Sequence, residues 1–415
     1  MHPCRAIYRA CSSKKPSDLL RRSRFQSLQH CSFLRGRRFM ASAPGSPFDP
    51  FLQNGTVVLD GGLSTSLPNG LEDHFLWAHQ LLYGMDGGLD VLKKVHREFL
   101  DNGADVIGTL TYKFSAETLN AVEKAGLLKD IENNHLTVGE LMSRSVGAAV
   151  QARDEFWEEY QASVAGSSSG SQDGFVTVPK SRSKPLVFGS CGPFNDNDVF
   201  KGATDPNTKG SGDDEESVLR CHYSMKIALL KAAGVDGIAA ESLPGKHEAM
   251  IAAEEMEKAG VPGWISFCCQ DDAHTNNGEL LSDCVKAVSS VPAVKAVGMN
   301  CFNPKYAESL IQIAKENTDR PIGVYPNSGE IWDARQGERC WHSGTDMKVL
   351  TGQDALAFKR AGACLIGGCC RVTPKQIGLF REALDMDSCD VLGNMDQIQQ
   401  NDGEVLKKQQ VASQM

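Results

Sequence analysis

The chain has 415 residues and a formal net charge of −9, from 43 Lys and Arg against 52 Asp and Glu. An acidic chain of this kind repels a phosphate backbone, which argues against nucleic acid as a ligand. No run of about 18 apolar residues occurs, so the sequence predicts no membrane-spanning helix. The 14 cysteines occur without a secretory signal, which favours a reducing compartment and metal or nucleophile chemistry over a disulfide framework.

The first 45 residues differ in composition from the rest. They contain eight Arg and two Lys against a single acidic residue, Asp18, with Ser scattered among them. This composition is typical of an organelle transit peptide, and the continuous apolar core of a secretory signal is missing. We expect mitochondrial import of a leader spanning 1–45. The alternatives are plastid import and a disordered basic tail on a cytoplasmic protein.

Eight short β-rich runs follow in chain order, each ending in a small or polar residue. They span residues 57–59, 105–108, 186–189, 237–240, 264–267, 294–299, 322–325 and 364–367. Helical patterns of apolar residues at three- and four-residue spacing lie between most of them. These patterns span residues 89–100, 218–233, 248–259, 306–314 and 354–361.

Eight strands that alternate with helices predict an α/β fold, a single-domain (β/α)8 TIM barrel over residues 50–388. A doubly wound sheet shares this rhythm and is the alternative. Polar insertions are expected after the second strand, at 161–184, and after the third, at 202–216, with a polar tail at 389–415. Glycines just past four helical patterns are expected to end those helices in the left-handed conformation. They are Gly103, Gly234, Gly260 and Gly362.

Three cysteines stand at the ends of predicted strands. Cys301 closes one apolar run, and Cys369 and Cys370 follow two glycines at the end of another. Neighbouring side chains on a strand point to opposite faces, so two adjacent thiols converge only where the backbone departs from regular geometry, which glycine permits. Zinc takes four protein ligands in structural sites, and three plus water or substrate in catalytic sites. The three cysteines therefore indicate a zinc site with one open position.

A second vicinal pair, Cys268 and Cys269, competes on spacing alone. No glycines precede it, so an ordinary strand would point its two thiols apart. Free cysteine also behaves as a small buried apolar residue, and we expect most of the fourteen to be inert.

Five segments at the predicted strand ends together resemble the homocysteine S-methyltransferase family over about residues 56 to 385. They are residues 60–65 (DGGLST), 241–244 (ESLP), 298–301 (GMNC), 325–330 (YPNSGE) and 367–374 (GGCCRVTP). The resemblance implies a zinc-dependent barrel that moves a methyl group to the sulfur of homocysteine, making methionine. It implies Cys301, Cys369 and Cys370 as zinc ligands. Because zinc-bound thiols are deprotonated outright, no general base is expected.

Glu241 follows a buried run, where an unpaired carboxylate is costly, so a substrate ammonium is its expected partner. The resemblance carries the same role to Glu241, with Asp60 assisting. A turn aspartate at Asp60 and a salt bridge from Glu241 to Lys246 are the alternatives. Further expected contacts are the polar side chains of Thr109, Thr111 and Asn300 and the aromatic faces of Tyr112 and Tyr325. An anion nest for the substrate carboxylate is expected at the amides of Gly61 and Gly62 or at those of Gly367 and Gly368.

The methyl donor is less defined than the acceptor. Residues 67–70 (LPNG) and 111–115 (TYKFS) depart from segments that family members using S-methylmethionine usually carry. The long C-terminal arm of the betaine-dependent branch and the folate and cobalamin modules of larger enzymes are not seen. We therefore expect a stand-alone, monomeric enzyme that uses S-methylmethionine or S-adenosylmethionine. A betaine-dependent enzyme, a selenocysteine methyltransferase and a non-catalytic zinc- or thiol-binding barrel are the alternatives.

Overall fold

The computed structural model describes residues 46–53, 55–68, 78–114, 123, 133–166, 182–194, 213–333, 340–342 and 349–388. The predicted leader and tail lie outside these residues. The elements are α3 (Asp49–Leu52), β1 (Val57–Val58), α4 (Leu63–Ser66), η2 (His79–Tyr83), α5 (Gly88–Asp101), β2 (Val106–Gly108), α7 (Val138–Gly166), β3 (Leu186–Cys191), α9 (Asp213–Ala233), β4 (Gly237–Leu243), α10 (Lys246–Ala259), β5 (Gly263–Phe267), α11 (Leu281–Ser289), β6 (Val294–Asn300), η3 (Pro304–Tyr306), α12 (Ala307–Asn317), β7 (Ile322–Tyr325), β8 (Ile331–Asp333), β9 (Cys340–His342), α13 (Gly352–Ala361), β10 (Leu365–Ile366) and α14 (Pro374–Ser388).

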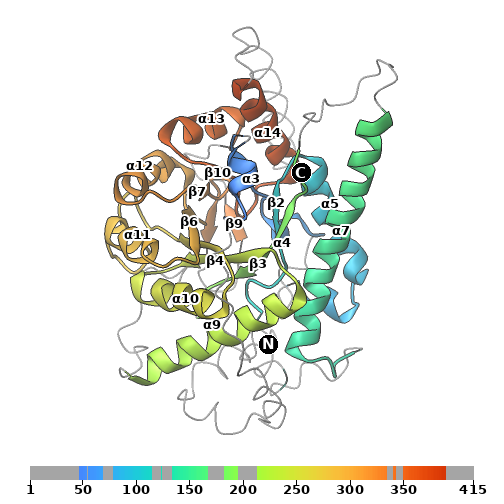
Figure 1. Cartoon of the computed structure of the whole chain (residues 1–415), viewed down its shortest axis with the longest axis horizontal. Coiled ribbons are helices and arrows are strands. Elements are labelled where there is room, and N and C mark those ends of the chain that lie inside the picture. The colour runs from blue at the N-terminus through green and yellow to red at the C-terminus, as the bar shows by residue number, and fades with distance from the viewer. Residues whose placement is uncertain are drawn as a thin grey trace.

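The strands form a closed parallel barrel (Figure 1). The eight-stranded sheet has the order β1-β10-β7-β6-β5-β4-β3-β2, and its pairings are parallel. The two edge strands meet because Leu59 forms a parallel bridge with Val106. The Asp105 amide also donates to the Val58 carbonyl at 2.7 Å. With helices α5, α7 and α9 to α14 around the strands in Figure 1, the predicted (β/α)8 barrel is confirmed.

Each predicted β-rich run overlaps one strand of the barrel. Strands β3, β4 and β6 extend further than predicted, to Cys191, Leu243 and Asn300. The four glycines expected to end helices all have positive φ angles, between 62° and 122°, as the left-handed cap requires. Among the described residues, no helix combines the length and the apolar composition needed to cross a membrane.

The bounds of the two predicted insertions need correction. Helix α7 continues to Gly166, six residues into the first insertion at 161–184, because residues 161–165 include no proline or glycine. Helix α9 begins at Asp213, inside the second insertion at 202–216. The rest of both insertions lies outside the described residues.

A short amino-terminal segment closes one end of the barrel interior. The Phe48 ring, just before α3, lies 5.4 Å from the Phe188 ring and 5.6 Å from the Trp264 ring, and the latter two stack at 4.5 Å. Phe48 is fully buried. These aromatic contacts fill the end of the barrel where the strands begin.

A buried ion-pair cluster secures the same end. The Asp105 carboxylate, only 5% exposed, pairs with the guanidinium groups of Arg182 and Arg381. Its Oδ2 also accepts the Val58 amide at 2.9 Å. Arg381 in turn donates to the Gly103 carbonyl at 2.9 Å. The cluster joins strands β1 and β2 to helix α14, and no charge in it is left without a partner.

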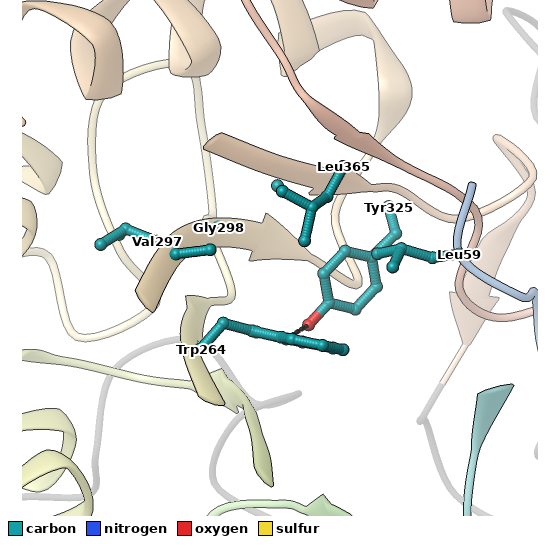
Figure 2. Close-up of a pocket in the computed structure, with 8 residues that line it drawn as sticks. Leu59, Trp264, Val297, Gly298, Tyr325 and Leu365 are labelled. Atoms are coloured by element: carbon teal, nitrogen blue, oxygen red, sulfur yellow. Dashed lines mark hydrogen bonds between the residues drawn. The ribbon is translucent and has the colours of Figure 1, made fainter. Parts of the chain in front are cut away.

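The middle of the barrel is a packed core rather than a channel. Leu59, Trp264, Tyr325 and Leu365 converge there (Figure 2), and the void among them is too narrow for a water molecule. The Trp264 indole donates to the Tyr325 hydroxyl at 2.9 Å. The barrel interior therefore has no room for a ligand, and the carboxyl ends of the strands are where (β/α)8 enzymes hold their sites.

Candidate metal and substrate site

Three thiols meet at the carboxyl end of the barrel. Cys301 follows β6, and Cys369 and Cys370 follow β10. The Cys301 Sγ lies 2.8 Å from the Cys369 Sγ and 3.6 Å from the Cys370 Sγ, and the last two are 3.9 Å apart. Among the described residues they form the one group of three or more side chains suited to hold a metal ion. The structure therefore brings together the three cysteines that the sequence singles out.

Backbone hydrogen bonds from neighbouring strands hold these cysteines. The Cys301 amide donates to the Tyr325 carbonyl at 3.3 Å, and the Cys369 amide donates to the Pro326 carbonyl at 2.8 Å. Cys301 has a φ angle of 57°. A non-glycine residue adopts this left-handed conformation at a cost of about 1–2 kcal/mol, so it persists only where the surroundings impose it.

The two glycines before Cys369 provide room. Neither has a left-handed φ angle, and a Cβ on Gly367 would lie 2.6 Å from the Leu59 Cβ. A Cβ on Gly368 would lie 2.2 Å from the Val372 side chain. Glycine is therefore needed at both positions because the turn packs closely against Leu59, just after β1, and against Val372, just after the cysteines.

The thiol cluster fits a zinc ion. Hydrogen bonding to Cys369 and Cys370 raises the pKa of the Cys301 thiol well above its usual range. Three thiolates this close repel one another unless a cation compensates them, and a divalent metal does so. Tetrahedral zinc with a Zn–S distance of about 2.3 Å separates its sulfurs by about 3.8 Å, close to two of the three observed separations.

The second vicinal pair splits as predicted. Cys269 packs in the main apolar core, whereas Cys268 clusters with Cys301. The Cys268 thiol donates to the Cys301 carbonyl at 3.2 Å and accepts from the Asn276 amide group at 3.3 Å. Cys268 thus lies next to the three-thiol cluster without belonging to it.

Two carboxyl groups share the barrel mouth with the thiols. The Glu241 carboxylate accepts hydrogen bonds from the hydroxyls of Ser190 and Tyr325, yet burial raises its pKa to about 7. Asp60 Oδ2 accepts the Gly108 amide at 2.8 Å. Burial raises the pKa of Asp60 to about 8, and the nearby Glu241 charge contributes to the shift.

Neither carboxylate forms an ion pair among the described residues. The alternative of a salt bridge from Glu241 to Lys246 is therefore wrong, because the two side chains do not meet. The Lys226 ammonium lowers the pKa of Glu241 somewhat, but it donates instead to the Tyr112 carbonyl, at 2.6 Å. The two carboxyl groups together offer a site for an added cation.

The two tyrosines that were expected to contact the substrate, Tyr112 and Tyr325, occupy different places relative to the barrel mouth. Tyr325 is 5% exposed, and its hydroxyl joins Trp264 in the barrel core to Glu241 at the mouth. Tyr112 is half-buried, and its ring lies against Gly192, where a Cβ would approach within 2.8 Å. Tyr112 therefore lies beside the mouth, whereas Tyr325 supports Glu241 from below.

Thr109 and Thr111, which were expected to contact the substrate, form hydrogen bonds with protein atoms. The hydroxyls of Thr109 and Thr111 lie 2.7 Å apart, and both side chains are buried. Thr109 accepts the Ser190 amide at 3.1 Å, and Thr111 donates to the Ser190 carbonyl at 2.7 Å. These bonds fix the strand that carries Ser190, the partner of Glu241.

Three of the four glycine amides considered for an anion nest are paired with backbone carbonyls. The Gly62 amide donates to the Val372 carbonyl at 2.9 Å, the Gly367 amide to Val324 at 3.1 Å, and the Gly368 amide to Asp60 at 3.0 Å. These amides are therefore already paired with backbone carbonyls. A Cβ on Gly61 would lie 2.3 Å from the Val372 carbonyl oxygen, so Gly61 serves close packing as well.

Three residues at the mouth were not singled out individually from the sequence. Arg371 has a φ angle of 67° and donates two hydrogen bonds to Glu330, at 2.6 and 3.0 Å. Within the described residues, Asn327 Oδ1 is buried without a hydrogen-bond partner. All three residues lie in segments 325–330 and 367–374, which resemble the family. That resemblance is the sequence feature that could have pointed to them.

A (β/α)8 barrel with three convergent thiols and two carboxyl groups without ion pairs at the carboxyl ends of its strands is typical of a barrel enzyme with a metal site. The family model for homocysteine S-methyltransferase matches residues 57–384. The chain belongs to the homocysteine S-methyltransferase family and is a methyltransferase.

Relatives and solved structures agree with this assignment. Homocysteine S-methyltransferase 4 of Zea mays is 32% identical over 343 residues, covering 80% of this chain and 90% of that protein. The selenocysteine methyltransferase of Astragalus bisulcatus is 32% identical over 340 residues, covering 78% of this chain and 91% of that protein. The metallated form of the homocysteine methyltransferase MmuM from Escherichia coli matches with a TM-score of 0.62 at 24% identity, over 81% of this chain and 99% of that one, which is a likeness of fold.

Proposed function

We propose that this protein transfers a methyl group from a sulfonium donor, S-methylmethionine or S-adenosylmethionine, to the thiol of homocysteine, forming methionine, with Zn²⁺ as its cofactor. The observation that carries the proposal is the convergence of three thiols beside two buried carboxyl groups that form no ion pair among the described residues. A thiol ligand and an ammonium group on one small molecule satisfy both features.

Cys301, Cys369 and Cys370 would hold the metal and leave one tetrahedral position for the substrate sulfur. Bound zinc supplies the deprotonation: a free thiol with a pKa near about 8.5 is only a few per cent thiolate at neutral pH, whereas a metal-bound thiol is ionised. The proton leaves to solvent. No side chain of the chain is then needed as a general base.

Glu241 and Asp60 would bind the homocysteine ammonium. Each loses hydration in the free site, so a cation that enters restores favourable electrostatics where the dielectric is low. Ser190 and Tyr325 orient the Glu241 carboxylate by hydrogen bonds. The substrate is thereby fixed at both ends, with its sulfur toward the cysteines.

The change in charge during methyl transfer favours a sulfonium as the methyl donor. The homocysteine thiolate gains the methyl group, and the donor sulfur keeps the electron pair of the broken S–CH3 bond, so that a sulfonium becomes a neutral thioether. Opposite charges disappear in this step, and a mouth that excludes water favours it more than bulk water does.

The test is methionine formation by purified, zinc-loaded protein with homocysteine and each donor in turn. We expect turnover with S-methylmethionine or S-adenosylmethionine that exceeds turnover with betaine. Activity with betaine alone would overturn the sulfonium assignment. Zinc binding without methionine from any of these donors would favour the non-catalytic barrel.

Selenocysteine is a second candidate acceptor, because a selenol binds zinc at least as readily as a thiol and one relative is named a selenocysteine methyltransferase. The same assay with selenocysteine in place of homocysteine measures this preference as a ratio of kcat/KM values.

A further inference from the structure

The Asn300 side chain, at the last residue of β6, is 1% exposed and surrounded by protein partners. Its Oδ1 accepts the Ser242 amide at 2.8 Å and the Ser266 hydroxyl at 2.7 Å. Its Nδ2 donates to the Ser242 hydroxyl at 2.7 Å, and the Cys369 Sγ lies 3.9 Å from the same nitrogen. Both lone-pair directions of the oxygen are therefore used, which leaves little capacity for a substrate.

Two of these bonds reach the turn that carries Glu241. Ser242 has a φ angle of 58°, and the pairing of β4 with β5 is irregular between Ala240 and Leu243. A left-handed serine at a bulge is a strained conformation that neighbours must impose. Asn300 supplies both a donor and an acceptor to Ser242, so it helps to fix the direction in which Glu241 leaves the strand.

The same side chain is adjacent to the thiol cluster. Asn300 precedes Cys301, whose own φ angle is 57°, and its amide group faces the Cys369 sulfur. An N–H group directed at a sulfur stabilises the ionised form of that sulfur relative to the thiol. One buried amide thus touches the Glu241 turn on one side and the thiol cluster on the other.

We propose that Asn300 is a positioning residue that couples the carboxylate of Glu241 to the metal-binding thiols, and that it contacts neither substrate. This inference rests on the proposed function for the roles of Glu241 and the cysteines. It replaces the sequence-based expectation that Asn300 is a polar contact for the substrate.

The decisive variant is Asn300→Asp, which keeps the oxygen for Ser242 and Ser266 but removes both N–H donors and adds a negative charge beside Cys369. We expect zinc affinity, measured by competition with a chromophoric chelator, to fall at least about tenfold, as is usual when a partner of a metal ligand is lost. The homocysteine KM of the fully zinc-loaded variant should rise by a similar factor. The thiolate-to-metal charge-transfer bands of the cobalt-substituted protein should also shift.

The matched control is Asn102→Asp. Asn102 donates from its side chain to the Glu98 carbonyl at 2.8 Å, at the end of α5 that precedes β2. The same chemical change there should alter neither zinc affinity nor the homocysteine KM.

Each outcome decides the proposal. A rise in KM with unchanged zinc affinity and unchanged cobalt bands would make Asn300 a substrate contact, and a loss of thermal stability alone would make it merely structural. If Asn300→Asp does not fold, Ser242→Ala removes only the hydroxyl that accepts from Nδ2, and a several-fold change in both zinc affinity and KM is expected. Wild-type protein that binds no zinc would refute the proposed function, whereas an active wild type with an unaffected Asn300→Asp refutes this inference alone.

Discussion

Two carboxyl groups at the barrel mouth, those of Glu241 and Asp60, carry an electrostatic cost of burial that their hydrogen bonds and the Lys226 ammonium offset only in part. Burial raises their pKa values to about 7 and about 8. Such shifts are characteristic of groups that meet a ligand charge, since ion-pair networks inside a protein usually satisfy their own carboxylates. The Asp105 cluster at the opposite end of the barrel shows that contrast, with two arginines on one carboxylate.

Glu241→Gln should weaken homocysteine binding by about 2–5 kcal/mol, because the countercharge to a desolvated ammonium is lost. In the wild type, Glu241 is ionised above about pH 7 and protonated below it, so kcat/KM for homocysteine should fall as the pH falls through 7. The variant should lose that pH dependence while zinc content stays unchanged. An unaltered KM and an unaltered pH profile would show that Glu241 is structural.

Cys369→Ala should remove both bound metal and activity while the barrel still folds, because one of three converging thiols is lost. Cys268→Ser is the control: its sulfur lies beside Cys301 yet outside the ligand group, so metal content should persist. Metal analysis and circular dichroism of the two purified variants check this. Undiminished zinc in Cys369→Ala would refute the ligand assignment.

Individual residues were predictable where the sequence pattern itself carries the geometry. Cys301, Cys369 and Cys370 end parallel strands, and the carboxyl ends of parallel strands meet at one face of a barrel. The long-range partners of Thr109, Gly62 and Asn300 were not predictable, because they lie in segments far away in sequence. The Gly62 amide is an example: it is paired with the carbonyl of Val372, 310 positions along the chain, and is not free for the expected anion nest.

At the scale of elements, the amino-terminal α3 and the residue before it form part of the barrel core. Phe48 contacts Phe188 and Trp264, residues that belong to β3 and β5. A helix of four residues is too short to show a periodic pattern, so this plug was not predicted. The eight strands were predictable because each is a buried apolar run ended by a small or polar residue.

Phe48→Ala should lower the free energy of unfolding by about 3–5 kcal/mol, because it leaves a cavity in a fully packed interior. The homocysteine KM of the folded variant at 25 °C should stay unchanged, since the thiols lie at the other end of the strands. Phe194→Ala, at a ring that is 37% exposed, is the matched control, with a change below about 1 kcal/mol expected. Denaturant unfolding of both variants provides the comparison. Equal losses in the two would show that the plug is not part of the core.

At the scale of the whole molecule, an acidic barrel follows a basic leader. The first 45 residues carry ten basic side chains and one acidic side chain, and the described barrel begins at Ser46. We propose that the leader directs import into mitochondria and contributes nothing to turnover.

Deletion of residues 1–40 should abolish import into isolated mitochondria and leave kcat and KM unchanged. Deletion of residues 1–52 should in addition destabilise the barrel, because it removes α3 together with Phe48 and Phe51. Import assays and unfolding curves of the two truncations separate targeting from folding. Full-length protein found only in the cytosol with an unprocessed amino terminus would refute the targeting proposal.

We propose that three cysteines hold zinc with one position open for the substrate sulfur. X-ray absorption at the zinc edge of the purified protein, before and after addition of homocysteine, measures this coordination directly. We predict three sulfur ligands at about 2.3 Å in the free protein and four once homocysteine is bound. Four sulfur ligands before addition, or a sulfur count that homocysteine leaves unchanged, would contradict it.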